Sequence, residues 1–324
     1  MGTAIEWTEA VWNPVTGCSK VSEGCRNCYA FALHDMRHKA FLEGKKLPQQ
    51  YAMPFSEIQL FPDRIIQPMK WREPRRVFVN SMADLFHPDV PFDFIDKVFA
   101  AMALSPKHTF QILTKRPARM LEYFQRDRLE LIERWAAAAY EITSRDDEAE
   151  VFVYNRLNAA FPQAKSGWPI QNVWLGTSVE NQKAADERIP FLLQVPAAVR
   201  FLSCEPLLGP VDLSGWLFTN EQGESMEPPI QWVIAGGESG NNARPMQPEW
   251  ATELRDQCQA AGVAFFFKQF GEWAPVHELR CNEPGIKGKQ WYNFDPDTSV
   301  CRVGKDRAGR LLDGREWSEF PGAI

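Results

Sequence analysis

Three cysteines near the start of the chain are the residues with the clearest chemistry. Cys18, Cys25 and Cys28 form a C-x6-C-x2-C triad that follows the first short apolar run of the sequence. Three thiolates on one loop can bind three irons of a 4Fe-4S cluster and leave the fourth iron open to another ligand. Gly17 and Gly24 let the backbone turn tightly around so bulky a group. We therefore predict an iron-sulfur site on this loop.

A structural zinc site is the alternative interpretation of the same cysteines. Its fourth ligand would be His34 or His38, which lie four residues apart on a predicted helix. Zinc sites usually use two separated ligand pairs, and the sequence holds no second C-x2-C motif. Because Arg37 and Lys39 flank the two histidines, we expect the histidines to lie at the surface in solvent.

The composition indicates a globular protein, and its cysteine usage is typical of a reducing compartment. The chain has 324 residues, 44% hydrophobic and 24% charged, with a net charge of −6 and seven cysteines. An odd cysteine count in a chain of this size argues against disulfides, and we expect Cys258 to pack in the core. The negative charge argues against a protein that coats nucleic acid. No apolar stretch reaches the ~18 residues of a membrane helix, and no signal peptide opens the chain, so we expect a soluble, cytoplasmic protein with no membrane partner.

Short apolar runs alternate with amphipathic segments along the chain. The apolar runs, which we interpret as buried parallel strands, are residues 11–12, 77–82, 109–114, 173–178, 200–204, 232–236 and 264–268. Such alternation predicts an α/β fold with a partial or complete parallel (β/α) barrel of six to seven strands. An open, doubly wound sheet is the second choice.

Helices are predicted between the strands, and two regions depart from the repeat. The helices are expected at residues 27–43, 92–104, 117–142, 181–194 and 248–261. Residues 125–169 are charged and rich in alanine, which predicts a double-helical insert. Residues 274–324 are rich in Gly, Pro, Asp and Trp and predict an irregular extension of turns and short hairpins that closes the barrel. The predicted domains are thus a barrel at 1–273 and an extension at 274–324.

Sequence motifs along almost the whole chain carry a family resemblance. The cysteine segment reads TGCSKVSEGCRNCYA, and the other motifs are SMADLFH, LTKRP, LGTSVEN, SCEPLLGP, GGESG, FFFKQFGEW and GRLLDGREWSEFP. Together they resemble the phage-associated radical-SAM-like family, whose members carry this wider triad, within the radical S-adenosylmethionine (SAM) superfamily. The architecture is distantly similar to that of spore photoproduct lyase. The sequence departs from the superfamily pattern in its six-residue first spacing and in Asn27, where an aromatic residue is usual.

The resemblance implies the chemistry, cofactors and partners of a radical SAM enzyme. SAM would chelate the open iron of the cluster, and an electron would cleave it to a radical that abstracts hydrogen from a substrate. A small electron-donor protein of the flavodoxin or ferredoxin type would supply that electron. The similarity to spore photoproduct lyase points to modification or repair of a nucleotide or nucleic acid.

Polar residues follow the predicted strands, where barrels bind their ligands. By superfamily logic, Ser81 or Asp84 would engage the SAM ammonium group, and Ser178 with Glu180 the ribose hydroxyls. Glu205 and Glu238 follow two later strands and are further candidates for cofactor binding. Glu238 belongs to a Gly-Gly-Glu triplet that resembles the superfamily's methionine-binding motif but follows the sixth strand instead of the second. An ordinary turn, or a contact of Glu238 with the substrate, is an equal interpretation.

Four basic residues are the candidates for substrate binding. Lys115, Arg116, Arg244 and Lys268 would place positive charge at the barrel mouth, where a nucleotide or a single-stranded nucleic acid could bind. Salt bridges to Glu180 or Glu205 are the alternative role. Which residue of the chain is catalytic stays open.

A second class of function is compatible with the same residues. A non-catalytic binding protein of phage or host, stabilised by zinc or by a cluster, would have a saturated metal site and no use for polar strand ends. Metal content separates the two hypotheses, because an iron-sulfur protein is brown and a zinc protein is colourless.

Overall fold

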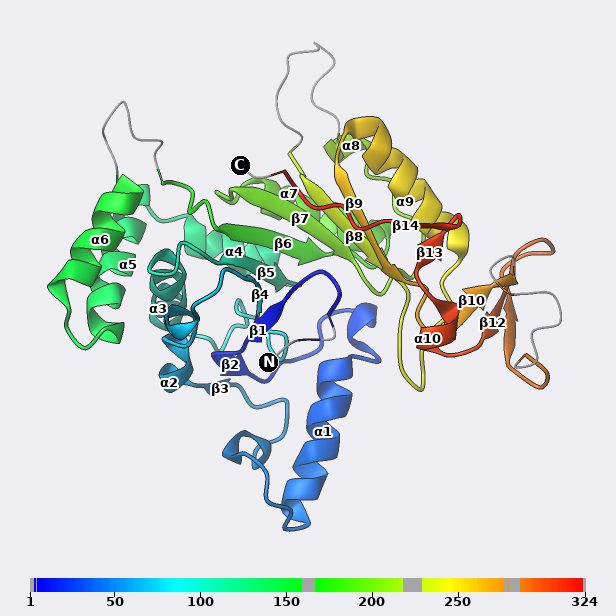
Figure 1. The fold of residues 1–324 in the computed structure, drawn as a ribbon, viewed down its shortest axis with the longest axis horizontal. Helices are drawn as coiled ribbons and strands as arrows, with labels where there is room; N and C mark the ends of the chain where they lie inside the picture. Colours follow the sequence, from blue (N-terminus) through cyan, green and yellow to red (C-terminus); the bar gives the residue numbers. More distant parts are fainter. Residues whose placement is uncertain are drawn as a thin grey trace.

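Seven parallel strands form the central sheet of the computed structural model (Figure 1). The structure describes residue 3, residues 5–158, 167–217, 229–276, residue 279 and residues 286–322. The strands follow one another across the sheet in chain order and are β1 (Ala10–Trp12), β4 (Arg76–Val79), β5 (Thr109–Thr114), β6 (Val173–Ser178), β7 (Val199–Cys204), β8 (Trp232–Gly236) and β9 (Ala264–Gln269).

The sheet is a curled half-barrel, which confirms the predicted partial parallel barrel. Each strand pairs with the next in parallel, and the strand order never reverses. A doubly wound sheet requires such a reversal, so that alternative is wrong. The free edge of β9 is covered by the chain end, where Phe267 N bonds to Trp317 O (2.9 Å) and Glu319 N to Phe265 O (3.1 Å). This cover satisfies backbone groups that an exposed edge would leave unpaired.

The predicted helices are present, with one correction. The longer helices are α1 (Tyr29–Leu42), α3 (Phe92–Ala103), α4 (Pro117–Phe124), α5 (Arg128–Ile142), α6 (Asp147–Asn158), α7 (Gln182–Leu193) and α9 (Pro248–Ala261). The single helix predicted over 117–142 is wrong, because the chain breaks between α4 and α5. Asp127 is the N-cap of α5 and its side chain accepts a bond from Leu129 N (2.8 Å), which starts a new helix.

Alternate residues of the strands from β4 to β9 face two separate cores. Outward residues such as Val77, Ile112 and Leu175 pack under the helices, as expected for buried parallel strands. The inward strand residues Phe78, Phe201, Trp232, Ile234 and Phe266 form, together with Trp7 from the segment before β1, a second and mostly aromatic cluster. This inner cluster fills the half-barrel below the carboxyl ends of the strands and forms a floor beneath them.

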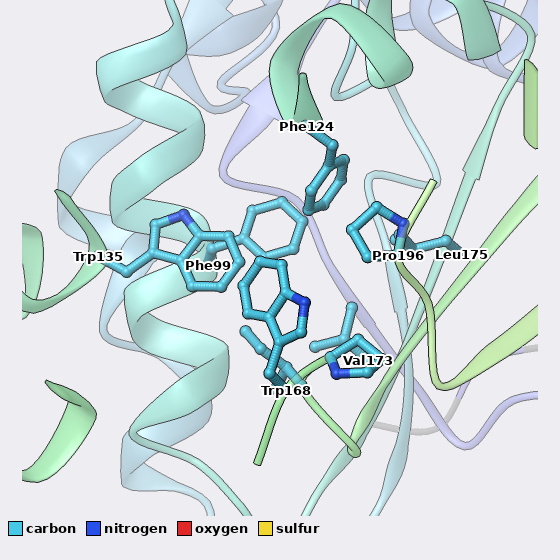
Figure 2. A pocket seen from close by; sticks show the side chains of 9 residues that line it. Phe99, Phe124, Trp135, Trp168, Val173, Leu175 and Pro196 are labelled. Carbon is cyan, nitrogen blue, oxygen red and sulfur yellow. The ribbon is translucent and has the colours of Figure 1, made fainter. Parts of the chain in front are cut away.

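The helical insert is attached to the sheet by stacked aromatic rings (Figure 2). Trp135 of α5 stacks on Phe99 of α3 at 5.0 Å between ring centroids and on Trp168 at 5.5 Å. These rings line a small apolar pocket together with Phe124, Val173, Leu175 and Pro196. The helices α5 and α6 pack as a pair at the periphery of the molecule (Figure 1), which confirms the double-helical insert within the described residues.

The segment after β9 consists of short strands and turns, as predicted. Its elements are β10 (Trp273–Pro275), β11 (Trp291–Asn293), β12 (Ser299–Arg302), α10 (Lys305–Ala308), β13 (Leu311–Leu312) and β14 (Arg315–Glu316). Trp273 is buried, whereas Trp291 is 44% exposed. Part of the extension, with Cys281, lies outside the described residues. Cys258 is fully buried in α9, which confirms its packing role.

The remaining elements are short and connect the larger ones. They are β2 (Val15–Thr16), η1 (Glu23–Cys25), η2 (Gln49–Tyr51), β3 (Gln59–Leu60), α2 (Pro62–Ile65), η3 (Pro68–Lys70) and α8 (Ser214–Leu217). Among the described residues, none of the helices has the length and apolarity needed to cross a bilayer.

The floor of the half-barrel gives a first testable prediction. The ring of Phe201 lies against Gly176 so closely that a Cβ there would sit 2.7 Å from the ring. Because the ring is fully buried and cannot move aside, Gly176→Ala should lower the free energy of unfolding by ~1–3 kcal/mol in a denaturant titration. Gly215→Ala, which meets no atom within 4 Å, is the matched control. Equal stability of the two variants would contradict this account of the floor.

Candidate functional site

The three cysteines lie on one loop at the carboxyl edge of the sheet. We use the name cysteine loop for residues 18–28. Its start is fixed by Gly17, whose φ of +107° and tight contact with the backbone of Glu57 exclude a side chain. Cys18 N then bonds to Phe55 O (2.9 Å). The loop makes one turn of 3-10 helix, η1, and Cys28 is the N-cap of α1. The loop therefore leaves β2 and returns to the fold over the strand ends.

All three cysteines are free thiols, and their surroundings differ. Cys25 is buried, and Cys18 and Cys28 are partly exposed. Burial and the charge of Asp84 raise the pKa of the Cys18 thiol to about 11, although Arg116 beside it acts in the opposite direction. The thiol is thus protonated at neutral pH, and binding of a metal would have to displace that proton.

The donor set of the cysteine loop is three free thiols. Among the described residues, no group of three or more His, Cys, Asp or Glu side chains is arranged to hold one metal ion. A single ion needs its ligands to converge, whereas a 4Fe-4S cluster binds each cysteine at a different iron and so spaces the sulfurs apart. Three thiols on one loop can supply three of the four positions.

The two histidines of the zinc alternative have other partners. His34 is fully buried, so its predicted surface position is wrong; its Nε2 lies 2.9 Å from Met53 O. Its ring also packs against Tyr51 and Phe55, a burial that the charged neighbours in the sequence do not reveal. The Nδ1 of His38 lies 2.8 Å from Tyr51 O.

The residues predicted after the second strand are bonded to the protein. The Ser81 hydroxyl donates to Asn13 Oδ1 (3.2 Å), and the Ser81 carbonyl accepts from the Tyr29 hydroxyl (2.6 Å). Asp84 is buried and accepts bonds from Thr114 Oγ1 (2.7 Å) and from Arg116 Nη1 (2.9 Å).

Arg116 connects this corner to the cysteine loop. Its Nη1 lies 3.8 Å from Cys18 Sγ, and its Nη2 donates to the Ser19 hydroxyl (2.8 Å) and carbonyl (3.0 Å). The same hydroxyl lies 2.7 Å from Nε2 of His87. Arg116 therefore holds the first residues of the loop against Asp84.

Glu180 follows β6 and occupies the centre of the edge. Its carboxylate is 1% exposed and accepts from the Ser22 hydroxyl of the cysteine loop (2.5 Å). It also pairs with Arg188 of α7 (2.6 Å) and with Lys115 (3.4 Å). Burial alone would raise the pKa of the Glu180 carboxyl, but the charges of Lys115 and Arg188 and the Ser22 bond bring it below its ordinary value.

Glu238 follows β8 and contacts the other end of the loop. It receives two bonds from the Arg244 side chain, at 2.7 and 2.9 Å, and one from Asn27 Nδ2 at 2.9 Å. Burial would raise the pKa of the Glu238 carboxyl, but these hydrogen bonds lower it below the ordinary value. Asn27 is thus the loop's contact with this strand end.

Glu205 and Lys268 pair with each other on the inner side of the strand ends. Lys268 Nζ donates to Glu205 Oε1 (2.6 Å), and the missing side chain of Gly236 on the strand between them leaves room for the pair. Ser178 lies at the inner end of β6, opposite Ser203 of β7. The Ser178 hydroxyl makes no hydrogen bond to another described residue, although Ser178 is 3% exposed.

The structure thus places every predicted site residue at the same edge, but it pairs most of their charges internally. Each of the four basic side chains predicted for the substrate has a carboxylate partner: Lys115 with Glu180, Arg116 with Asp84, Arg244 with Glu238, and Lys268 with Glu205. The salt bridges to Glu180 and Glu205 are those of the alternative interpretation. Ser22 and Arg188 were not predicted; the position of Arg188 on the buried face of a helix is a signal that could have identified it.

Comparisons with known proteins give a family and little else. A family model described as "Protein of unknown function (DUF5131)" matches residues 2–321. The chain belongs to the DUF5131 family. No curated protein and no solved structure matches the DUF5131 chain.

The pairing of Glu180 predicts a pH-dependent stability. The pKa of Glu180 is lowered in the folded state. The contribution of the ionised carboxylate to the free energy of unfolding is therefore complete above the ordinary carboxyl pKa of about 4.3, and it is lost as the pH falls through the folded-state pKa. Glu180→Gln leaves the buried Arg188 without its countercharge and should lower the free energy of unfolding by about 3 kcal/mol at pH 7. We expect the difference from wild type to shrink below about pH 4, measured by denaturant titration at each pH.

The matched control for this titration is Glu187→Gln on α7, the helix that carries Arg188. The Glu187 side chain is 59% exposed and pairs with Lys183 at 3.8 Å, so its loss should change stability by less than ~1 kcal/mol. A stability difference between Glu180→Gln and wild type that is the same at all pH values would refute the ionic role of Glu180.

Proposed function

We propose that this chain is a radical SAM enzyme, in which Cys18, Cys25 and Cys28 bind a 4Fe-4S cluster. The observation that supports it best is the place of the cysteine loop: three free thiols lie over the carboxyl edge of a parallel half-barrel. This edge is where barrel folds bind their ligands and cofactors. The resemblance of the cysteine motif to the radical-SAM-like family supports the same proposal.

The residues of the chain have separable tasks in this proposal. The three thiols would hold the cluster, which when bound supplies the electron that cleaves SAM. The inner side of the strand ends offers SAM the hydroxyl of Ser178, which bonds to no other described residue, and the charges of Glu205 and Lys268. The aromatic floor with Phe201 and Trp232 closes the half-barrel below and excludes water from that side. Roles of Ser81, Asp84, Glu180 and Glu238 in binding SAM stay predictions.

The substrate is a separate part of the proposal. A nucleotide or single-stranded nucleic acid stays the predicted class, and binding it at the mouth would require a phosphate to replace a carboxylate partner of Lys115, Arg244 or Lys268. An electron-donor protein of the flavodoxin or ferredoxin type and a cytoplasmic location also stay predictions. Phosphate contacts that displace existing salt bridges gain little free energy, so such binding should be weak and sensitive to salt.

Removal of single thiols tests the cluster. Cys18→Ala, Cys25→Ala and Cys28→Ala should each lose most of the iron after anaerobic reconstitution, because each removes one of three protein ligands. Cys258→Ala and Cys301→Ala, which remove buried thiols elsewhere in the fold, should keep the iron and are the controls. Iron and acid-labile sulfide per chain are the measurement. Full iron content in the triple variant of the triad would refute the proposal.

The competing function is a zinc-stabilised binding protein without catalysis. If that function is correct, the wild-type protein will hold one zinc per chain even after reconstitution with iron. It will then show no broad absorbance near 400 nm. Under our proposal, the reconstituted protein is brown, and zinc does not displace the cluster at one equivalent.

A further inference from the structure

The six-residue spacer between Cys18 and Cys25 has few backbone bonds of its own. Cys25 N bonds to Ser22 O and Arg26 N to Glu23 O, both at 3.0 Å, and these close the single turn of η1. One turn of 3-10 helix is marginal by itself. The spacer therefore depends on side-chain contacts with the strand ends for a defined position.

Glu180 provides the central contact. The Ser22 hydroxyl donates to its carboxylate at 2.5 Å, and Gly24 lies so close to the same carboxylate that a Cβ at residue 24 would overlap it. Glu180 cannot move aside, because Arg188 and Lys115 hold it from behind and it is 1% exposed. The fixed, buried carboxylate of Glu180 thus contacts the loop at Ser22 and at Gly24.

Glu238 provides a second contact between the other two cysteines. Asn27 Nδ2 donates to Glu238 Oε2 and, at 2.8 Å, to the carbonyl of Asn242. Arg244, which is paired with Glu238, reaches the carbonyl of Glu23 at 3.1 Å. Each of the two intervals between the cysteines is therefore hydrogen-bonded to one glutamate at a strand end. Glu180 contacts the interval between Cys18 and Cys25, and Glu238 contacts the interval between Cys25 and Cys28.

We propose that Glu180 and Glu238 are positioning residues that fix the cysteine loop over the strand ends before any cluster is present. The inference rests on the proposed function in that the loop is taken to hold the cluster. Preorganised ligands lose less conformational entropy when they bind. A carboxylate committed to Ser22, Arg188 and Lys115 has few acceptor sites left for ribose hydroxyls, so positioning the loop is the role that the contacts of Glu180 support. The same reasoning explains why an asparagine stands at residue 27.

Thiol labelling of the cluster-free protein tests the anchoring without any cofactor. Labelling of buried Cys25 under native, reducing conditions reports the opening of the loop, whereas Cys204 and Cys258 report global unfolding. Ser22→Ala and Asn27→Ala should each speed labelling of Cys25 by about tenfold, which corresponds to ~1.4 kcal/mol, and leave Cys204 and Cys258 protected. Peptide mass spectrometry over a labelling time course measures each cysteine separately.

Three further variants sharpen the test. Ser56→Ala removes an exposed hydroxyl near the loop and should label like wild type. Glu180→Ala should open the loop most, and Glu180→Gln, which keeps an acceptor for Ser22, should restore part of the protection. Wild-type labelling rates of Cys25 in both Ser22→Ala and Asn27→Ala would overturn the inference. So would a rise of Cys25 labelling in Ser22→Ala and Asn27→Ala that Cys204 and Cys258 match, because that pattern means general destabilisation.

A second measurement separates this inference from the proposed function. After reconstitution, the rate of iron release to a chelator should rise in Ser22→Ala and Asn27→Ala relative to wild type and to Ser56→Ala. A reconstituted protein that releases iron equally fast in all of these would overturn the anchoring of the cluster site. The two proposals can also fail separately. If Ser22→Ala and Asn27→Ala speed the labelling of Cys25 but the wild-type protein never retains iron, the anchoring is supported and the cluster is refuted.

Discussion

Buried carboxylates at the carboxyl ends of parallel strands must find counterions, and this constraint organises the whole edge of the sheet. Asp84, Glu180 and Glu238 are each at most 6% exposed, and each has an arginine partner. Leaving one such anion unpaired would cost several kcal/mol. The arginines come from the following strand end, helix or loop, so each pair also fixes the segment that carries it.

The cysteine loop donates hydrogen bonds to carboxylates that also accept from these arginines. Ser22 binds the carboxylate of Glu180, and Asn27 binds that of Glu238, while Arg116 donates to Ser19. A carboxylate has about four lone-pair sites and accepts from an arginine and from a loop at the same time. The position of the three thiols therefore depends on these side-chain contacts together with the backbone anchors of the loop at Cys18 and Cys28.

The sequence predicts the sheet well because its strands are buried on both faces. The strands at 109–114, 173–178 and 232–236 begin and end where the structure has them. Apolar periodicity continues through Asp127, however, so the break between α4 and α5 could not be seen in it. His34 was misplaced because its burial depends on Tyr51 and Phe55, which belong to another segment. The site residues were predicted at the correct edge, but their partners were not, since pairs such as Ser22 and Glu180 are 158 residues apart.

The most direct measurement of the central claim is the effect of SAM on the reconstituted, reduced protein. Electron paramagnetic resonance of the reduced cluster, recorded with and without SAM, reports whether SAM reaches an iron that the protein leaves open, and mass spectrometry detects 5′-deoxyadenosine. The account predicts a changed spectrum on addition of SAM and formation of 5′-deoxyadenosine that requires Cys18, Cys25 and Cys28. A spectrum indifferent to SAM with no 5′-deoxyadenosine, or a colourless protein with one bound zinc, would contradict it.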